Sequence, residues 1–215
     1  MPKAKSKRAL DPGAALTGHA SGQSRLQFPA QHIIYSQGGK ADALFYIESG
    51  LVKISVVVPS GKEAVVGIRR ERDLFGTRCL VGQRMGTATA LTATSLIRVT
   101  TSAVTRLLRE EPDFAVNFAI HLLHQSIYDQ ENLVDQLTNS AERRLARTLL
   151  QLADFSNHDV SPIPAQINQT LLAEMVGTTR SRINFFMNKF KRQALIEYDR
   201  HGGISVRNSL LDLLT

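Results

Sequence analysis

The spacing of apolar residues changes near residue 100 and divides the chain into two regions. Between Leu26 and Thr100 the apolar residues fall in short β-prone runs separated by glycine, which predicts many short antiparallel strands and hence a small barrel or roll. The predicted strands are His32–Tyr35, Ala43–Glu48, Leu51–Val58, Glu63–Arg69, Thr87–Thr94 and Leu96–Val99. The glycines expected at or beside their turns are Gly38, Gly39, Gly50, Gly61 and Gly82.

From Thr101 onward the apolar spacing is helical. It predicts a short helix over Ser102–Glu110 and a long one that begins at Pro112. The long helix carries apolar residues at alternating four- and three-residue steps, interrupted at Gln130. These seam residues are Val116, Ile120, Leu123, Ile127, Val134 and Leu137. Such a seam predicts pairing with a second copy, and packing within the monomer is the alternative. On another face, Phe114, Phe118 and Leu122 are expected to cover the open end of the roll.

Two short helices joined at Gly177 are predicted over Gln169–Phe190. The glycine supplies the left-handed backbone of a tight turn, and Thr178 or Thr179 caps the second helix. This second helix is expected to bury Ile183, Phe186, Phe190 and Ala194. Its opposite face is polar and basic, which favours a DNA-binding helix-turn-helix over an ordinary helical hairpin. The pattern also predicts a preceding helix over Glu142–Phe155, a loop over Ser156–Ala165, and a following two-strand wing formed by Leu195–Tyr198 and Ile204–Val206.

Bulk composition agrees with a globular DNA-binding protein. The 215 residues carry a net charge of +7, which fits a polyanionic partner. Residues 1–25 form a predicted basic arm that either touches DNA phosphates or is a solvated tail. The single cysteine, Cys79, excludes an intrachain disulfide and a cysteine-only metal or iron–sulfur site. No run of residues is long and apolar enough to span a bilayer, so we expect no membrane contact and a cytoplasmic protein. No motif activates a catalytic nucleophile, and the sequence predicts neither an enzyme nor a metal or cofactor site.

Three segments together resemble the CRP/FNR family of bacterial transcription regulators. They are LLAEMVGTTRSRINFFMNKF with the following ALIEY, the roll segment FYIESGLVKI, and RRLARTLLQLA. The resemblance extends from Leu26 to about Leu211. It implies an α+β fold with an N-terminal antiparallel β-roll of the cyclic-nucleotide-binding type, a long dimerisation helix and a C-terminal winged helix-turn-helix. The implied regions are a flexible basic arm (1–25), the roll (26–111), the dimerisation helix (112–138) and the DNA-binding domain (139–215).

The resemblance also implies a homodimer on a palindromic operator, with RNA polymerase as a partner and a small-molecule effector in the roll. Arg180 and Ser181 match two of the family's base-contacting positions, and Arg180 suits a bidentate bond to guanine. Phe185 stands where the family often has arginine, so it either contacts a thymine methyl group or packs. The predicted base-reading residues are Arg180, Ser181, Asn184 and Phe185. The predicted phosphate contacts are Thr179, Arg182, Asn188, Lys189, Lys191 and Arg192.

The segment FGTRCLVGQRMGTATAL departs from the family's cyclic-nucleotide cassette. Thr77 replaces the glutamate that accepts from the ribose hydroxyl. Arg84 falls at the phosphate-binding position, but Met85 follows it where a hydroxyl is expected. Asp129 on the long helix either repels a phosphate or faces solvent. The sequence therefore predicts an effector other than cAMP, with cAMP binding through Arg84 as the alternative. The candidate pocket residues are Phe75, Gly76, Thr77, Arg84, Met85 and Asp129.

Other interpretations make different predictions. His121 and His124 are conceivable haem ligands, although interface histidines are commoner. Cys79 is either a redox switch or an inert buried thiol. In place of a transcription regulator, the chain could be a ligand-binding module whose terminal domain contacts protein, or a non-specific architectural DNA binder. Salt dependence separates DNA binding from protein contact, and operator preference separates a regulator from an architectural protein.

Overall fold

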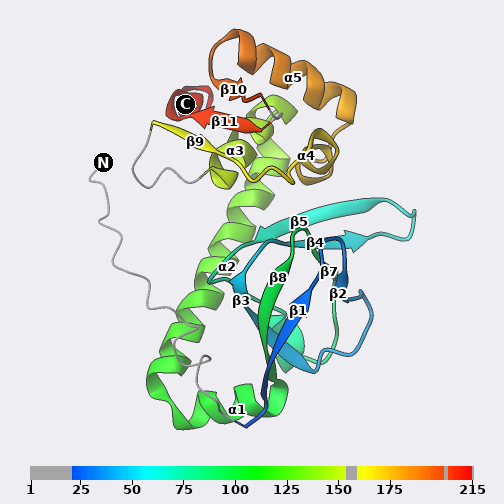
Figure 1. Ribbon diagram of the computed structural model, residues 1–215, viewed down its shortest axis with the longest axis vertical. Coiled ribbons are helices and arrows are strands. Elements are labelled where there is room, and N and C mark those ends of the chain that lie inside the picture. The colour runs from blue at the N-terminus through cyan, green and yellow to red at the C-terminus, as the bar shows by residue number, and fades with distance from the viewer. Residues whose placement is uncertain (1–20, 154–158, 201–202, 215) are drawn as a thin grey trace. The chain divides into compact units, whose positions relative to one another are not determined.

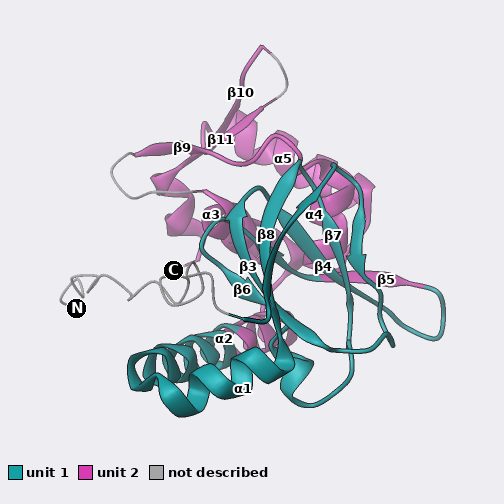
Figure 2. Cartoon of the chain, turned by 60° about the horizontal axis from the view of Figure 1, so that its bottom comes forward, with its two compact units in different colours: residues 1–61, 66–128 teal, residues 62–65, 129–215 magenta. Residues whose placement is uncertain are grey.

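The computed structural model describes residues 21–153, 159–200 and 203–214. The chain divides into two compact units. Unit 1 comprises residues 1–61 and 66–128, and unit 2 comprises residues 62–65 and 129–215 (Figure 2). The division falls within the long helix, ten residues before its last residue, Thr138.

Unit 1 is an antiparallel β-roll built from two four-stranded sheets (Figure 1). In the first sheet the order is β1-β8-β3-β6, and its strands are β1 (Gln23–Phe28), β8 (Thr94–Thr100), β3 (Ala43–Ser49) and β6 (Leu74–Phe75). In the second the order is β2-β7-β4-β5, and its strands are β2 (Ile33–Tyr35), β7 (Thr87–Ala90), β4 (Val52–Val57) and β5 (Glu63–Arg69). The predicted antiparallel roll is confirmed.

Strand β3 is apolar along most of its length because both of its faces are buried. Phe45 and Ile47 point into the roll, where the Phe45 ring stacks on Phe75 with centroids 5.1 Å apart. The alternate residues Leu44 and Tyr46 belong to a second core cluster. This alternation follows from the two-residue period of a strand.

The second core cluster joins the outer face of the first sheet to two helices. They are α1 (Thr101–Glu110) and α2 (Pro112–Thr138). The Thr100 side chain caps α1 by accepting from the Ala103 amide at 3.3 Å. Phe114 and Phe118 of α2 are buried in this cluster, as predicted, whereas Leu122 remains exposed. One helical turn beyond Phe118, the helix face has passed the edge of the cluster.

Unit 2 combines three helices with a small sheet. The helices are α3 (Ala141–Leu152), α4 (Gln169–Val176) and α5 (Arg180–Arg192). The sheet has the order β10-β11-β9, with β10 (Ile196–Tyr198), β11 (Ile204–Arg207) and β9 (Val160–Pro162). The core contains fully buried side chains from all three helices, among them Leu145, Leu149, Leu172, Ile183 and Phe190. Helices α4 and α5, together with this sheet, confirm the predicted winged helix-turn-helix.

Several predicted boundaries are wrong. Strand β1 begins at Gln23, inside the predicted arm, and its Arg25 pairs with Glu48 at 2.5 Å. The remainder of the arm, residues 1–20, lies outside the described residues. The predicted strand Thr87–Thr94 is broken, because β7 ends at Ala90 and β8 begins at Thr94. The predicted loop Ser156–Ala165 contains β9, so the wing sheet has three strands and not two. Helix α3 ends at Leu152, and Phe155 lies outside the described residues.

Across the described ranges, none of the helices is both long enough and apolar enough to cross a membrane.

Candidate nucleic-acid interface

The turn between α4 and α5 depends on Gly177. This residue ends α4 in the left-handed conformation, with φ at 71°, and its amide donates to the Ala173 carbonyl at 3.0 Å. A Cβ atom here would meet only the Gln136 side chain, at 3.7 Å. The backbone conformation, and not crowding, therefore requires glycine at this position.

The next helix begins at a side-chain cap. The Thr179 hydroxyl accepts from the Arg182 amide at 3.3 Å, which satisfies one of the unpaired amides of the first turn of α5. Of the two threonines that the sequence offered as caps, the structure selects Thr179. The predicted phosphate contact of Thr179 would have to be made by the same hydroxyl group that caps the helix.

One face of α5 anchors the helix in unit 2. Ile183, Met187 and Phe190 are fully buried, and Phe186 is nearly so. The prediction that Ala194 is buried is wrong. Helix α5 ends at Arg192, and Ala194 adopts a positive φ of 54° and is exposed as the chain turns toward β10. Met187 was missed, although its position four residues after Ile183 marks the same buried face.

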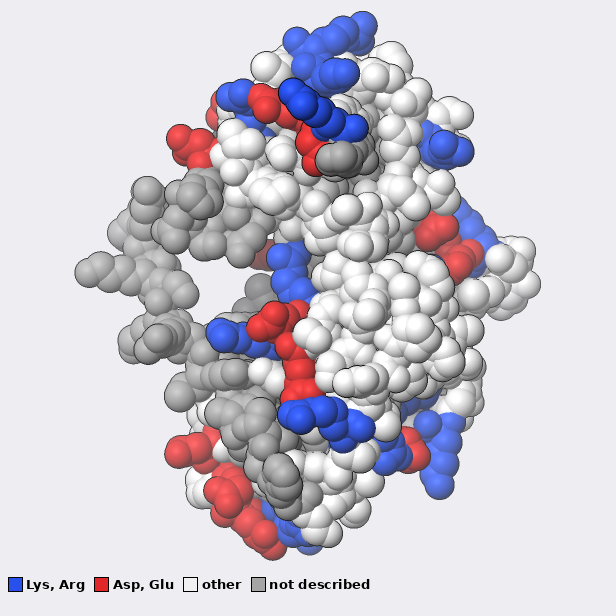
Figure 3. Space-filling view, viewed as in Figure 1, with Lys and Arg blue, Asp and Glu red and all other residues white. Residues whose placement is uncertain are grey.

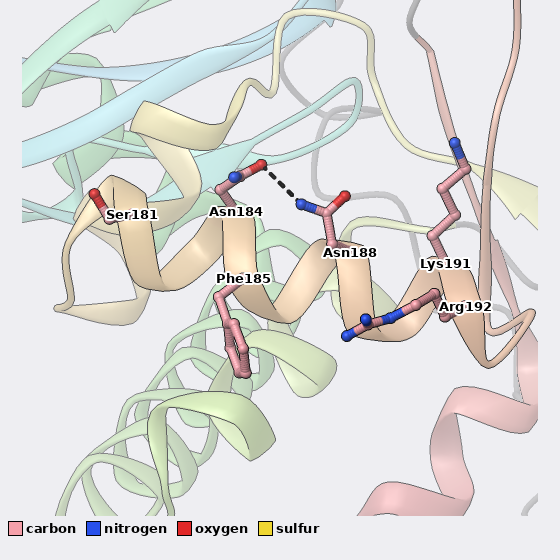
Figure 4. Close-up of a pocket in the computed structure, with 6 residues that line it drawn as sticks. All are labelled: Ser181, Asn184, Phe185, Asn188, Lys191 and Arg192. Carbon is pink, nitrogen blue, oxygen red and sulfur yellow. Dashed lines mark hydrogen bonds between the residues drawn. The ribbon is translucent and has the colours of Figure 1, made fainter.

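The opposite face of α5 brings six of the predicted DNA-contacting residues together. They line an open depression and are Ser181, Asn184, Phe185, Asn188, Lys191 and Arg192 (Figure 4). The Asn184 side-chain oxygen accepts from Asn188 at 3.3 Å and from Gln169 of α4 at 3.4 Å. In Figure 4 Phe185 points to the opposite side of the helix from this amide pair. The face therefore offers a polar stripe beside an exposed aromatic ring.

Helix α5 carries five basic residues and no acidic one. They are Arg180, Arg182, Lys189, Lys191 and Arg192. Figure 3 shows Lys and Arg side chains gathered over the part of unit 2 that carries α5. Three of these cations have partners in the same unit. Lys189 pairs with Glu142 at 2.7 Å, Lys191 lies 5.5 Å from the centre of the Tyr198 ring, and Arg182 lies 6.0 Å from that of Phe186. The Glu142 pairing reduces the charge that Lys189 offers to a phosphate.

A group of polar contacts at the junction of α2 and α3 was not predicted from the sequence. Arg144 donates to the Asn139 carbonyl at 2.9 Å and to the Val176 carbonyl, at the end of α4, at 3.1 Å. Asp135 is buried, its carboxylate lies 3.2 Å from Arg147, and it accepts from the side-chain nitrogen Nδ2 of Asn139 at 2.7 Å. These contacts fix the end of α4, and with it the helix-turn-helix, to the end of α2. The only sequence signal was the pair of arginines after the helix break.

The predicted seam residues of α2 lie on the surface of the single chain. Their side chains are between 43% and 76% exposed, a range that covers Val116, Ile120, Leu123, Ile127, Val134 and Leu137. An apolar row of this length on one helix is typical of a surface that a second helix covers.

Comparison with known proteins agrees with this arrangement. Residues 25–111 match the cyclic nucleotide-binding domain, and residues 143–209 match the Crp-like helix-turn-helix domain. The CRP-like cAMP-activated global transcriptional regulator of Mycobacterium tuberculosis is 26% identical over 179 residues, which cover 81% of this chain and 80% of that protein. The chain belongs to the CRP/FNR family of bacterial transcription regulators. That family consists of regulators and not of enzymes.

The chain is also similar to a second curated regulator in sequence and to a solved structure in fold. The global nitrogen regulator of Synechococcus elongatus is 28% identical over 178 residues, covering 79% of this chain and 80% of that protein. The structure of FixK2 from Bradyrhizobium japonicum shares the fold with a TM-score of 0.80 at 15% identity, over 89% of this chain and 96% of that one.

The six predicted effector residues differ in burial and lie on different elements. Phe75 is buried, Gly76 has a φ of 77°, and Thr77 begins a short 3-10 helix over Thr77–Leu80. Met85 is 55% exposed, and Asp129 is exposed on α2 in unit 2. Of the six residues, the structure brings Phe75, Gly76 and Arg84 together in the roll.

Arg84 is only 3% exposed, and its guanidinium group is already bonded within the protein. Nη1 donates to the Gly76 carbonyl at 3.0 Å and Nη2 to the Ala43 carbonyl at 2.6 Å. The guanidinium carbon lies 4.2 Å from the centre of the Tyr35 ring. Burial lowers the pKa of Arg84 and raises that of Tyr35. Arg84 thus ties the cassette to β3 through backbone carbonyls.

Replacing Arg84 by methionine is expected to lower the free energy of unfolding by about 1–3 kcal/mol, because two buried carbonyls lose their donors. Urea unfolding followed by circular dichroism measures the change. Arg98→Met is the matched control: Arg98 pairs with Asp42 at the surface at 2.9 Å, and its loss should cost less than about 1 kcal/mol. Equal stabilities for Arg84→Met and wild type would show that the buried contacts contribute nothing.

The structure does not favour the other candidate sensors, which are Cys79 as a redox switch and His121 with His124 as haem ligands. Cys79 is buried, and burial raises the pKa of its thiol, which keeps it protonated and unreactive at neutral pH. His121 is half-buried, which lowers its pKa, whereas His124 is exposed. Over the described part of the chain, no group of three or more His, Cys, Asp or Glu side chains is placed to hold a metal ion.

Proposed function

We propose that this CRP/FNR regulator is a sequence-specific DNA-binding protein that acts as a homodimer on a two-fold symmetric operator. The observation that carries the proposal is the outer face of α5. It presents polar and basic side chains without an acidic one, on a helix held by a buried face and begun by a threonine cap. Arg180 and Ser181 open this helix, and residues at this end of a recognition helix contact base edges in the major groove.

The contacts divide into two classes. Arg180, Ser181, Asn184 and Phe185 read bases. The remaining polar and basic residues supply affinity through phosphates, and they are Thr179, Arg182, Asn188, Lys189, Lys191 and Arg192. Because phosphate contacts release counterions, binding weakens steeply with added salt. A terminal domain that contacted protein instead would lack this steep dependence.

The exposed apolar seam of α2 supports the homodimer. Pairing of two copies would remove six apolar side chains per protomer from water. In such a dimer, the two recognition helices enter major grooves about 34 Å apart, so the half-sites are related by a two-fold axis and lie about one helical turn apart. RNA polymerase is the partner through which a regulator of this family acts on transcription. We place the protein in the cytoplasm, where it meets the bacterial chromosome.

The effector, if the roll binds one, differs from cAMP in this proposal. Thr77 provides no carboxylate for a ribose hydroxyl, and the Arg84 guanidinium already donates to two backbone carbonyls. Titration calorimetry with cAMP should show no binding at micromolar concentrations. Micromolar binding that disappears in Arg84→Met would reverse this part of the proposal. That outcome would leave the DNA-binding part intact.

Selection from a random-sequence duplex library tests the DNA-binding proposal. The purified full-length protein should enrich a motif with two inverted half-sites about one helical turn apart. Enrichment of no motif would contradict the proposal and would favour an architectural DNA binder or a protein-contact module. Enrichment of a single half-site would contradict the dimer alone.

A further inference from the structure

Phe185 is more exposed than the other phenylalanines that the structure describes. It is 60% exposed, whereas every other phenylalanine among the described residues is buried or half-buried. It lies on the face of α5 that otherwise carries amide, hydroxyl and basic side chains. An exposed aromatic ring on a polar surface is typical of a residue that becomes buried when a partner binds.

The position of Phe185 on the helix is central to that face. Residues three, four or seven apart share one side of an α-helix, so Phe185 follows Ser181 by one turn and precedes Arg192 by two turns. Figure 4 shows both Phe185 and Arg192 on the side of the helix away from the Asn184–Asn188 amide pair. A helix in the major groove that places Ser181 near the bases also brings Phe185 to them.

The ring is also held in place. It contacts Phe186 edge-on, with centroids 5.6 Å apart and planes 70° apart, and Phe186 is itself buried. Phe185 therefore lies against a fixed surface at its base and projects from it. A fixed apolar group loses little conformational entropy on binding, which suits a contact that must select one base.

The chemistry of the major groove leaves one matching group. A phenyl ring has no donor or acceptor, and the base edges present donors and acceptors except for the C5-methyl group of thymine. We propose that Phe185 is a specificity-determining residue that contacts a thymine methyl group in each half-site. The inference rests on the proposed DNA-binding function and adds the group that one position of that site recognises.

Uracil substitution in the selected operator tests this contact, because it removes only the methyl group. Thymines are replaced in symmetric pairs by deoxyuridine, and the affinity of the full-length protein is measured by fluorescence anisotropy. Replacing the symmetric pair of thymines that Phe185 contacts should weaken binding by about fourfold per half-site, and by about 15-fold for both half-sites together. This is the effect expected for one buried methyl group in each half-site. At that position, 5-methylcytosine paired with guanine should bind better than unmethylated cytosine.

Variants link the effect to Phe185. In Phe185→Ala the uracil and thymine operators should bind equally, whereas Phe185→Leu, which keeps an apolar side chain, should retain part of the preference. Asn188→Ala, on the same helix but on the side away from the ring, should retain all of it. Since Phe185 is exposed, thermal unfolding of these variants should be close to wild type.

Three outcomes overturn the inference. They are the absence of any thymine pair that is sensitive to uracil, an equal sensitivity in Phe185→Ala, and a sensitivity that Asn188→Ala abolishes instead. All three are observed on an operator that the wild-type protein binds in preference to a shuffled duplex. Absence of that preference would refute the proposed function itself, so the two failures are distinguishable.

Discussion

Arg180→Ala is expected to reduce the preference for the operator over a shuffled duplex by about 5- to 150-fold for each half-site, which corresponds to about 1–3 kcal/mol. A dimer carries two Arg180 residues, so the preference is reduced at both half-sites. Arg180 is exposed at the first position of α5, where its guanidinium group can donate two bonds to one guanine. Anisotropy titrations with both duplexes at one salt concentration measure the loss.

The matched control is Arg182→Ala, two residues later on the same exposed turn. Arg182 lies 6.0 Å from the centre of the Phe186 ring, at the edge of the reading face. Its loss should weaken binding to both duplexes by a similar factor and reduce the salt dependence, as expected for a phosphate contact. If Arg180→Ala instead weakened both duplexes equally, Arg180 would be a phosphate contact and not a base reader.

The double substitution Leu123→Glu with Ile127→Glu should convert the dimer to a monomer. These residues occupy the middle of the seam and are among its exposed apolar side chains. Burial of one such side chain stabilises by about 1.5–3 kcal/mol, and the dimer contains four of them. We therefore expect the dissociation constant of the dimer to rise by about 10⁴-fold or more, and the buried carboxylates to weaken the dimer further. Sedimentation equilibrium measures the change.

Gln136→Glu is the control for the seam. Gln136 is exposed on the same helix but about half a turn away from the seam, so the added charge should leave the dimer intact. The monomeric double variant should also lose operator binding, because one half-site alone supplies about half of the binding free energy. If the double variant remained a dimer, the seam would not be the dimer interface.

The helical half of the molecule was largely predictable because its signals are local. The left-handed turn at Gly177 and a threonine cap follow from what each residue permits its own backbone to do, although the sequence left Thr178 and Thr179 as alternatives for the cap. The long helix was predicted with its observed bounds, since Pro112 starts it and its apolar residues recur at helical spacing on both sides of Gln130. Strand β3 was predicted almost completely because an apolar run buried on both faces has few alternatives.

Features that depend on distant partners were not predictable. β6 and β9 are two and three residues long, too short for a periodic signal, and pairing defines them. The carbonyl contacts of Arg84 come from Gly76 and Ala43, and the pairing of Lys189 with Glu142 crosses from α5 to α3. In each case the residue type suggested a role, and the fold decided which neighbour the side chain meets.

The most direct test of sequence-specific DNA recognition compares the affinity of the dimer for the selected operator with its affinity for a shuffled duplex of equal length. Both are measured at physiological salt. We expect a preference of about 10³-fold or more, as is typical of specific regulators. Affinities within about tenfold of each other would contradict sequence-specific recognition, whatever the tightness of binding, since phosphate contacts alone produce such binding.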